Sequence, residues 1–184
     1  MWKGKNVTVF VTGGIAAFKA ATLVRLFVKA GANVEVAMTK SACEFITPLT
    51  FQVLTKNKVH TDTFDEDEAD RVQHIHLADK TDVAVVVPAT ANTIAKLANG
   101  IADNFVTSTL LATTAPVYVA PAMNEHMWEN PATVRNVVQL QSDGKVIIEP
   151  ATGFLAEGYN GKGRLPEPEK IFEQVTFFES RRLY

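Results

Sequence analysis

Two apolar segments of this 184-residue sequence each end in a proline and a short polar loop. Residues 83–87 lead into PATANT (88–93), and residues 117–120 lead into PAMNEHMW (121–128). Ligands of open α/β sheets bind beyond the carboxyl ends of the strands, so the two loops predict one shared pocket. Their hydroxyl and amide side chains are suited to binding a polar ligand.

A third predicted strand runs into Gly13-Gly14-Ile15-Ala16. Glycines between a strand and a helix expose backbone N–H groups at the positive end of the helix dipole, where a phosphate binds. The spacing differs from G-x-G-x-x-G and therefore favours a single phosphate, such as that of FMN, over a pyrophosphate. A tight turn without a ligand is the alternative. Other small polar residues at strand ends are candidates for the same ligand or for helix capping: Thr39, Ser41, Thr90, Asn92 and Thr93.

The elements that must position these loops alternate along the chain. Strands are predicted at 6–12, 33–38, 82–87, 117–120 and 146–148, and helices at 15–30, 48–55, 91–99, 103–111, 130–142 and 169–180, with a helical turn at 74–78. This order predicts an α/β fold, a single doubly wound domain over 1–184 with a flavodoxin- or Rossmann-like parallel sheet and helices on both faces. The acidic run 65–70 predicts a solvated loop, and the glycine-rich segment 150–168 predicts a long loop that acts as a lid.

Composition excludes several classes of protein. With 47% hydrophobic and 21% charged residues, the chain can bury one sizeable core, and its net charge of -2 provides no basic field for nucleic acid or an anionic membrane. The single cysteine, Cys43, excludes an intrachain disulfide and a cysteine-based metal site, and no metal is expected. No apolar run approaches the ~20 residues of a membrane span, and the N-terminus lacks a signal-peptide layout. We therefore expect a cytoplasmic protein.

Three motifs together resemble one known family. PATANT is similar to a PASANT motif, PAMNEHMW fits P-x-M-N-x-x-M-W without a gap, and QHIHLA (73–78) is similar to an active-histidine segment. All three are typical of the homo-oligomeric flavin-containing cysteine decarboxylases, which include phosphopantothenoylcysteine decarboxylase and the lantibiotic peptidyl-cysteine decarboxylases. The resemblance covers nearly the whole chain, and residues 13–19 and 47–50 are similar to the coenzyme A branch.

The resemblance implies an FMN held between subunits of a trimer or of an assembly of trimers. It implies decarboxylation of phosphopantothenoylcysteine to phosphopantetheine through a thioaldehyde and an enethiol. A C=S bond β to the carboxylate gives the electrons released with CO₂ a sink. The cofactor-binding residues that we expect are Gly13, Gly14, Ile15, Ala16, Thr39, Ser41, Phe45, Pro88, Thr90, Asn92, Thr93 and Met123.

The resemblance assigns acid/base catalysis to His74 and the grip on the substrate to Asn124. Histidine suits its role because its ordinary pKa, about 6.5, allows proton transfer near neutrality. An asparagine amide donates to a carboxylate without charge, so it neither repels the group nor holds it too firmly. The alternatives are a surface histidine and a helix-capping asparagine. His76 is expected to be a bystander, and His60 and His126 are expected at the surface.

Residues 152–164 resemble the family's substrate-recognition clamp, with Glu157 at the position of the usual cysteine acid. Glu157 is a candidate replacement if the closed lid desolvates it and raises its pKa. Lys162 and Arg164 are expected to meet the substrate phosphate, and Met127 to line the pocket. Three alternatives stay open: oxidative decarboxylation of a C-terminal peptidyl cysteine, a non-catalytic flavin-binding regulatory protein, and a chain that is the N-terminal part of a bifunctional decarboxylase-ligase.

Overall fold

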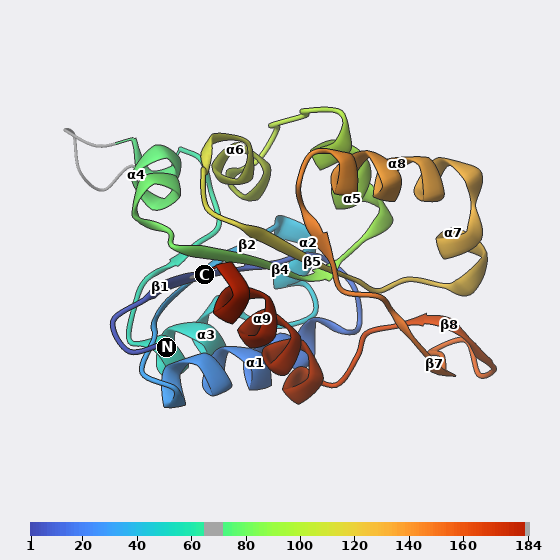
Figure 1. The fold of residues 1–184 in the computed structure, drawn as a ribbon, viewed down its shortest axis with the longest axis horizontal. Coiled ribbons are helices and arrows are strands. Elements are labelled where there is room, and N and C mark those ends of the chain that lie inside the picture. The colour runs from blue at the N-terminus through green and yellow to red at the C-terminus, as the bar shows by residue number, and fades with distance from the viewer. Residues whose placement is uncertain (65–71, 183–184) are drawn as a thin grey trace.

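The computed structural model describes residues 1–64 and 72–182, and the predicted acidic loop at 65–70 lies outside these ranges. The main sheet is parallel, in the order β3-β2-β1-β4-β5-β6 (Figure 1). Its strands are β1 (Asn6–Val11), β2 (Asn33–Met38), β3 (Val59–His60), β4 (Val83–Ala89), β5 (Val117–Pro121) and β6 (Val146–Ile147). This order confirms the predicted doubly wound fold.

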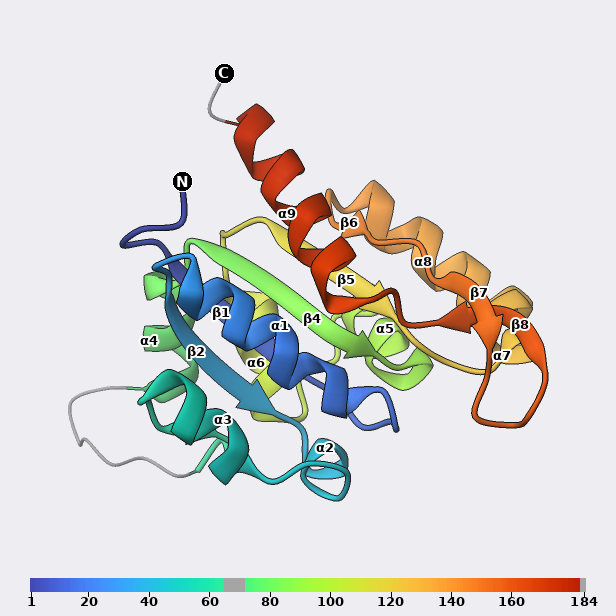
Figure 2. The ribbon, with the colours of Figure 1, turned by 90° about the horizontal axis from the view of Figure 1, so that it is seen from below.

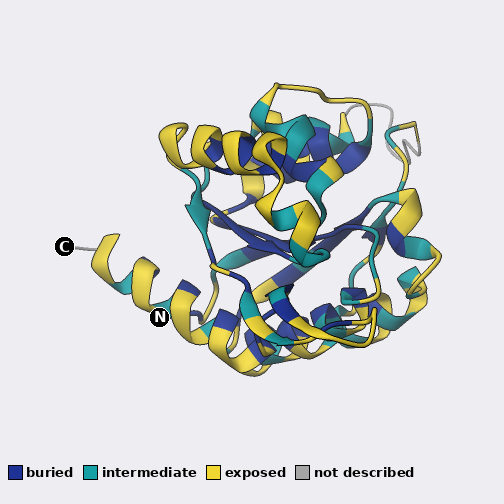
Figure 3. Cartoon of the chain, turned by 90° about the vertical axis from the view of Figure 1, so that its right-hand side faces the viewer, coloured by how far each residue is buried: buried dark blue, intermediate teal, exposed yellow. Residues whose placement is uncertain are grey.

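Helices cover both faces of the sheet. One face carries α1 (Ala17–Lys29), α3 (Pro48–Thr55) and α9 (Pro168–Arg182), and the other carries α4 (Gln73–Lys80), α5 (Ala91–Ala98), α6 (Phe105–Ala112) and α8 (Pro131–Ser142) (Figure 1). The short helices α2 (Lys40–Cys43) and α7 (Glu125–Glu129) follow β2 and β5. Figure 3 shows the buried residues concentrated in the sheet between the two helical layers.

The apolar strands explain why the sheet lies at the centre. Along β1, Val7, Val9 and Val11 pack in the core beneath α1, whereas Phe10 packs in the core beneath α4 and α6. All seven residues of β4 are buried. Burial on both faces is what a parallel strand with helices on each side requires, and it holds the polar strand ends at one edge of the sheet.

The prediction of a long loop without regular structure at 150–168 is wrong. This segment contains an antiparallel hairpin, β7 (Ala151–Phe154) and β8 (Asn160–Arg164), in which Gly153 pairs with Gly161. Figure 2 shows the hairpin beyond the end of β4. Glycine has no side chain to alternate between faces, so the pattern of a strand was hidden in the sequence.

The sequence analysis missed two very short elements and predicted a third shorter than it is. Strand β3 has only two residues and α7 only five, too few for a period to be visible. The helical turn predicted at 74–78 is the eight-residue helix α4. These additions leave the predicted layers unchanged.

A buried hydrogen bond attaches α9 to the sheet. Tyr118 on β5 is fully buried and donates from its hydroxyl to Glu179 Oε1 at 2.6 Å. Arg182 Nη1 lies 3.9 Å from the same carboxylate oxygen. Burial, and then the bond to Glu179, raise the pKa of Tyr118 above its ordinary value near 10. The neutral phenol therefore stabilises the folded state below about pH 10, and this contribution is lost as the pH rises through the raised pKa.

We expect Tyr118→Phe to lower the free energy of unfolding by about 1.5–3 kcal/mol at neutral pH, because Glu179 loses a hydrogen bond in a buried position. Above about pH 10 the wild type begins to lose this contribution, and the difference between the two proteins should shrink. Urea denaturation of both proteins at pH 8 and at about pH 10.5 checks this. A difference that stays constant across this pH range would contradict the assignment.

Candidate functional site

The loops that follow β1, β4 and β5 meet at one edge of the sheet and line a cavity of about 560 Å³. This confirms the single pocket predicted from the two proline-containing loops. The hairpin closes one side of the cavity. Of the predicted site residues, those lining it are Gly13, Gly14, Ile15, Ala16, Pro88, Thr90, Met123, Asn124, Met127, Glu157 and Arg164.

Close backbone contacts hold these loops together. The buried hydroxyl of Thr12 donates to the carbonyl of Pro88 at 2.6 Å and accepts from the N–H of Thr90 at 3.1 Å. A Cβ on Gly13 would lie 2.4 Å from Cβ of Ser41. Only a glycine therefore allows the loop after β1 to approach the start of α2 so closely.

A second, more polar cavity of about 470 Å³ shares Gly13 and Thr90 with the first. The predicted polar residues Thr39, Ser41, Asn92 and Thr93 line it. The capping alternative is also realised here, because Thr39 accepts from the N–H of Ala42 at 3.2 Å and Thr90 accepts from that of Thr93 at 3.2 Å. Capping orients these hydroxyls and leaves them at the wall of the cavity.

Asn124 is both the N-cap of α7 and part of the cavity wall. Its Oδ1 accepts from the backbone N–H of His126 at 2.9 Å. Its Nδ2 donates to the hydroxyl of Tyr159, in the hairpin, at 2.7 Å. Sequence reasoning anticipated the cap but missed Tyr159, because no local pattern pairs residues 35 positions apart.

The hairpin is docked on the loop after β5. The N–H of Met123 donates to the carbonyl of Gly163 at 3.0 Å, and the N–H of Lys162 donates to Glu125 Oε1 at 2.8 Å. The side chain of Lys162 does not line the cavity; its Nζ lies 3.2 Å from Glu149 Oε2. Of the two predicted phosphate-binding cations, Arg164 is therefore the one that the structure places at the cavity.

Lys19 is a cavity residue that sequence reasoning did not select. It lies in the first turns of α1 and lines the 560 Å³ cavity. Its Nζ donates to Glu167 Oε1 at 2.9 Å, and this bond is the first cause of a lowered Glu167 pKa. Its position five residues after Gly14, in the first turn of the helix, was the signal available in the sequence. Phe45, by contrast, is exposed and lines neither cavity.

His74 lies away from Asn124 within one chain. It belongs to α4, lines neither cavity, and packs edge-to-face against Phe105 with ring centroids 6.4 Å apart. Figure 1 places α4 and the hairpin at opposite ends of the molecule. Among the described residues, Nδ1 of His74 is a buried atom without a hydrogen-bond partner. A buried polar atom of this kind normally has a partner, so one supplied from outside the chain would satisfy it.

The expectation of a surface position is wrong for His60 and right for His126. His60 Nε2 lies 3.1 Å from Glu35 Oε2, and the ring stacks on Phe105 at 4.9 Å. Phe105 thus contacts the rings of both His60 and His74, and it also lines the polar cavity. His126 is exposed.

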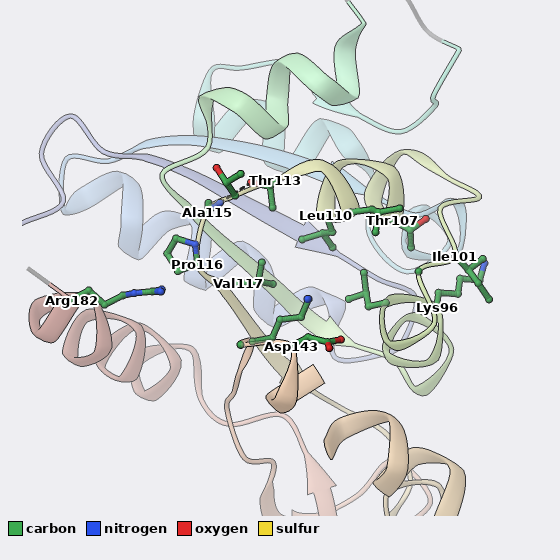
Figure 4. A pocket seen from close by; sticks show the side chains of 16 residues that line it. Lys96, Ile101, Thr107, Leu110, Thr113, Ala115, Pro116, Val117, Asp143 and Arg182 are labelled. Carbon is green, nitrogen blue, oxygen red and sulfur yellow. Dashed lines mark hydrogen bonds between the residues drawn. The ribbon is translucent and has the colours of Figure 1, made fainter. Parts of the chain in front are cut away.

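A further cavity, of about 300 Å³, lies among α5, α6, the start of β5 and the turn at 143–145 (Figure 4). None of the predicted site residues lines it. In the described part of the chain, no group of three or more His, Cys, Asp or Glu side chains is arranged to hold a metal. Over those same residues, no helix has the length and apolar character needed to cross a membrane.

Comparison with known proteins finds relatives that match nearly the whole chain. A model of the flavoprotein family matches residues 1–178. The chain is 56% identical over 171 residues to the coenzyme A biosynthesis bifunctional protein CoaBC of Bacillus subtilis, covering 93% of this chain and 42% of that protein. It is 43% identical over 173 residues to a probable phosphopantothenoylcysteine decarboxylase of Streptococcus mutans, covering 93% of this chain and 97% of that protein. The chain therefore spans less than half the length of the bifunctional relative.

Two solved structures share the fold over almost the full length. One is a cysteine-to-serine mutant of PPC decarboxylase complexed with pantothenoylaminoethenethiol, with a TM-score of 0.86 and 34% identity over 97% of this chain and 100% of that chain. The other is the FMN binding protein AtHal3, with a TM-score of 0.81 and 36% identity over 96% of this chain and 97% of that chain.

Proposed function

Because the chain belongs to the flavoprotein family, we propose that it is an FMN-dependent phosphopantothenoylcysteine decarboxylase. The observation that carries the proposal is the cavity in which the Gly13 loop, PATANT and PAMNEHMW converge, with the amide of Asn124 at its wall. The names of the Bacillus and Streptococcus relatives and of the PPC decarboxylase structure support the same activity. We assign residues 1–184 to a single flavin-binding decarboxylase domain, corresponding to one part of the bifunctional relatives, and we propose a cytoplasmic location.

FMN is the cofactor, and the two adjoining cavities fit its two halves. The larger cavity has apolar walls that suit the flavin ring, including Ile15, Ala16 and Met123. The smaller one has the hydroxyl and amide groups that suit a ribityl phosphate, including Ser41, Asn92 and Thr93. FMN supplies the two-electron chemistry that interconverts the CH₂–SH and C=S forms of the substrate carbon.

The chain's own residues bind the substrate and move its protons. One N–H of the Asn124 amide donates to the substrate carboxylate, which keeps that group in place without an opposing charge. The imidazole of His74 accepts a proton from the substrate. Arg164 lies at the cavity and provides a cation for the substrate phosphate. A peptide tail would have less use for this cation, which favours the phosphopantothenoyl substrate over a peptidyl cysteine.

We propose further that the site is completed by a second copy of the chain in a homo-oligomer, a trimer or an assembly of trimers. The separation of His74 from Asn124, and the unpartnered Nδ1 of His74 among the described residues, support this arrangement. Three exposed apolar side chains lie on α4 or α6 or at the N-cap of α4: Val72, Ile75 and Leu111. Such residues at an oligomer interface would bring His74 of one subunit to the cavity of another.

The products formed from phosphopantothenoylcysteine under anaerobic conditions test the function and the role of Glu157. Glu157 lines the cavity, and its carboxylic acid can donate the proton that accompanies the hydride which reduced FMN would return, so that the enethiol becomes the saturated thiol. Mass spectrometry should find phosphopantetheine with the wild type. With Glu157→Gln, which cannot supply that proton, it should find the enethiol instead.

Other outcomes would identify a different function. If the wild type itself stops at the enethiol, the protein is an oxidative decarboxylase. Glu157 is the observation that favours this second candidate function, because it stands where the family has the cysteine that acts as the acid. If no CO₂ is released while FMN stays bound, a peptidyl substrate or a regulatory role replaces the proposal.

A further inference from the structure

The orientation of the Asn124 amide is determined by its neighbours. The backbone N–H of His126, 2.9 Å away, can only donate, so the oxygen of the amide must face it. The NH₂ group then faces the hydroxyl of Tyr159 at 2.7 Å, and this hydroxyl is the acceptor. In the described part of the chain, no further acceptor contacts Asn124 Nδ2, so one N–H remains for a ligand in the cavity.

The position of Tyr159 is set by the turn of the hairpin. The carbonyl of Tyr159 accepts from the N–H of Leu155 at 2.8 Å, and the carbonyl of Leu155 accepts from the N–H of Gly158 at 3.0 Å. Gly158 has a φ of +90°, which favours glycine at this point of the turn. The buried side chain of Leu155 anchors the turn against the rest of the protein.

From this geometry we propose that Tyr159 is a positioning residue for recognition of the substrate carboxylate. Its hydroxyl accepts from one N–H of Asn124. This bond stops the amide from rotating about its Cβ–Cγ bond, so the second N–H points in one direction, toward the cavity. The hairpin must be docked for this contact to form. Recognition of the carboxylate and closure of the hairpin are therefore one event. This inference rests on the proposed function, because it assigns a role to Asn124 in that reaction.

The inference predicts an effect that depends on the carboxylate. Tyr159→Phe keeps the ring and removes only the acceptor, which leaves the amide of Asn124 held by the bond from the N–H of His126 alone. We expect KM for phosphopantothenoylcysteine to rise about five- to tenfold, which is the size of effect expected for loss of one hydrogen bond between uncharged groups. The inhibition constant of the product phosphopantetheine, which has no carboxylate, should change less than about twofold.

A matched control separates positioning from loosening of the hairpin. Glu125→Ala removes another contact of the hairpin, the bond from the N–H of Lys162, without touching the side chain of Asn124. A looser hairpin should weaken the binding of the substrate and of the product to a similar degree. The experiment compares the FMN-loaded wild type, Tyr159→Phe and Glu125→Ala, with KM, kcat and the product inhibition constant measured for each.

The inference is supported if Tyr159→Phe raises KM but not the product inhibition constant, and if Glu125→Ala raises both. An unchanged KM for Tyr159→Phe, or an equal rise in its product inhibition constant, overturns it while the proposed function stands. A wild type that releases no CO₂ overturns the proposed function, and the inference with it. The two failures are distinguishable because the wild type is assayed first.

Discussion

Replacement of His74 by asparagine should reduce CO₂ release from phosphopantothenoylcysteine by at least about 10²-fold, the lower end of what general acid–base catalysis contributes. Asparagine has a similar reach but cannot exchange a proton near neutral pH. His74 lines neither cavity assigned to FMN, so the purified variant should remain yellow. Release of CO₂ and the visible absorbance of bound flavin check both halves of this prediction. Full turnover by the variant would show that His74 is not the acid/base.

The same variant also tests whether the site lies between subunits. His74→Asn and Asn124→Ala should each be inactive alone. If the two residues act from different subunits, co-refolding the two variants should restore about a quarter of the sites, since half of the subunits supply each intact residue. If both residues act from one chain, mixing cannot restore any site. A sample of each variant refolded alone serves as the control.

Gly163→Ala is expected to have the second largest effect. Gly163 has a φ of +139°, and a Cβ there would lie 2.2 Å from the carbonyl oxygen of Met123. The backbone bond from the N–H of Met123 to the carbonyl of Gly163 should therefore break, and the hairpin should move away from the cavity. We expect kcat/KM to fall at least about tenfold, because a small displacement of positioning groups costs that much or more.

The main sheet should survive this change, since β7 and β8 pair only with each other. Thermal unfolding followed by circular dichroism should thus show a folded protein with bound flavin. Gly153→Ala is the matched control: it lies in the same hairpin, its φ is not positive, and its nearest neighbour is the flexible side chain of Arg164. Equal losses in the two variants would contradict the proposed clash at Gly163.

The doubly wound fold followed from the sequence because its signals are local. The runs of β4 and β5 are apolar on both faces, β1 alternates valines with other residues, and the segments between the strands have the apolar period of a helix. The positions of Gly13, PATANT and PAMNEHMW after these strands followed too, since parallel strands bring their carboxyl ends to one edge. A cavity lined by these loops was therefore predictable without coordinates.

Contacts between segments that are distant in the sequence were decided only by the tertiary structure. The pairing of β7 with β8, the contact of His60 with Glu35 and the bond between Asn124 and Tyr159 each leave no periodic trace in the sequence. The separation of His74 from the cavity was likewise invisible in the motif that named this residue as a candidate. Local patterns specify which face of an element is buried, whereas these contacts depend on which elements the completed fold brings together.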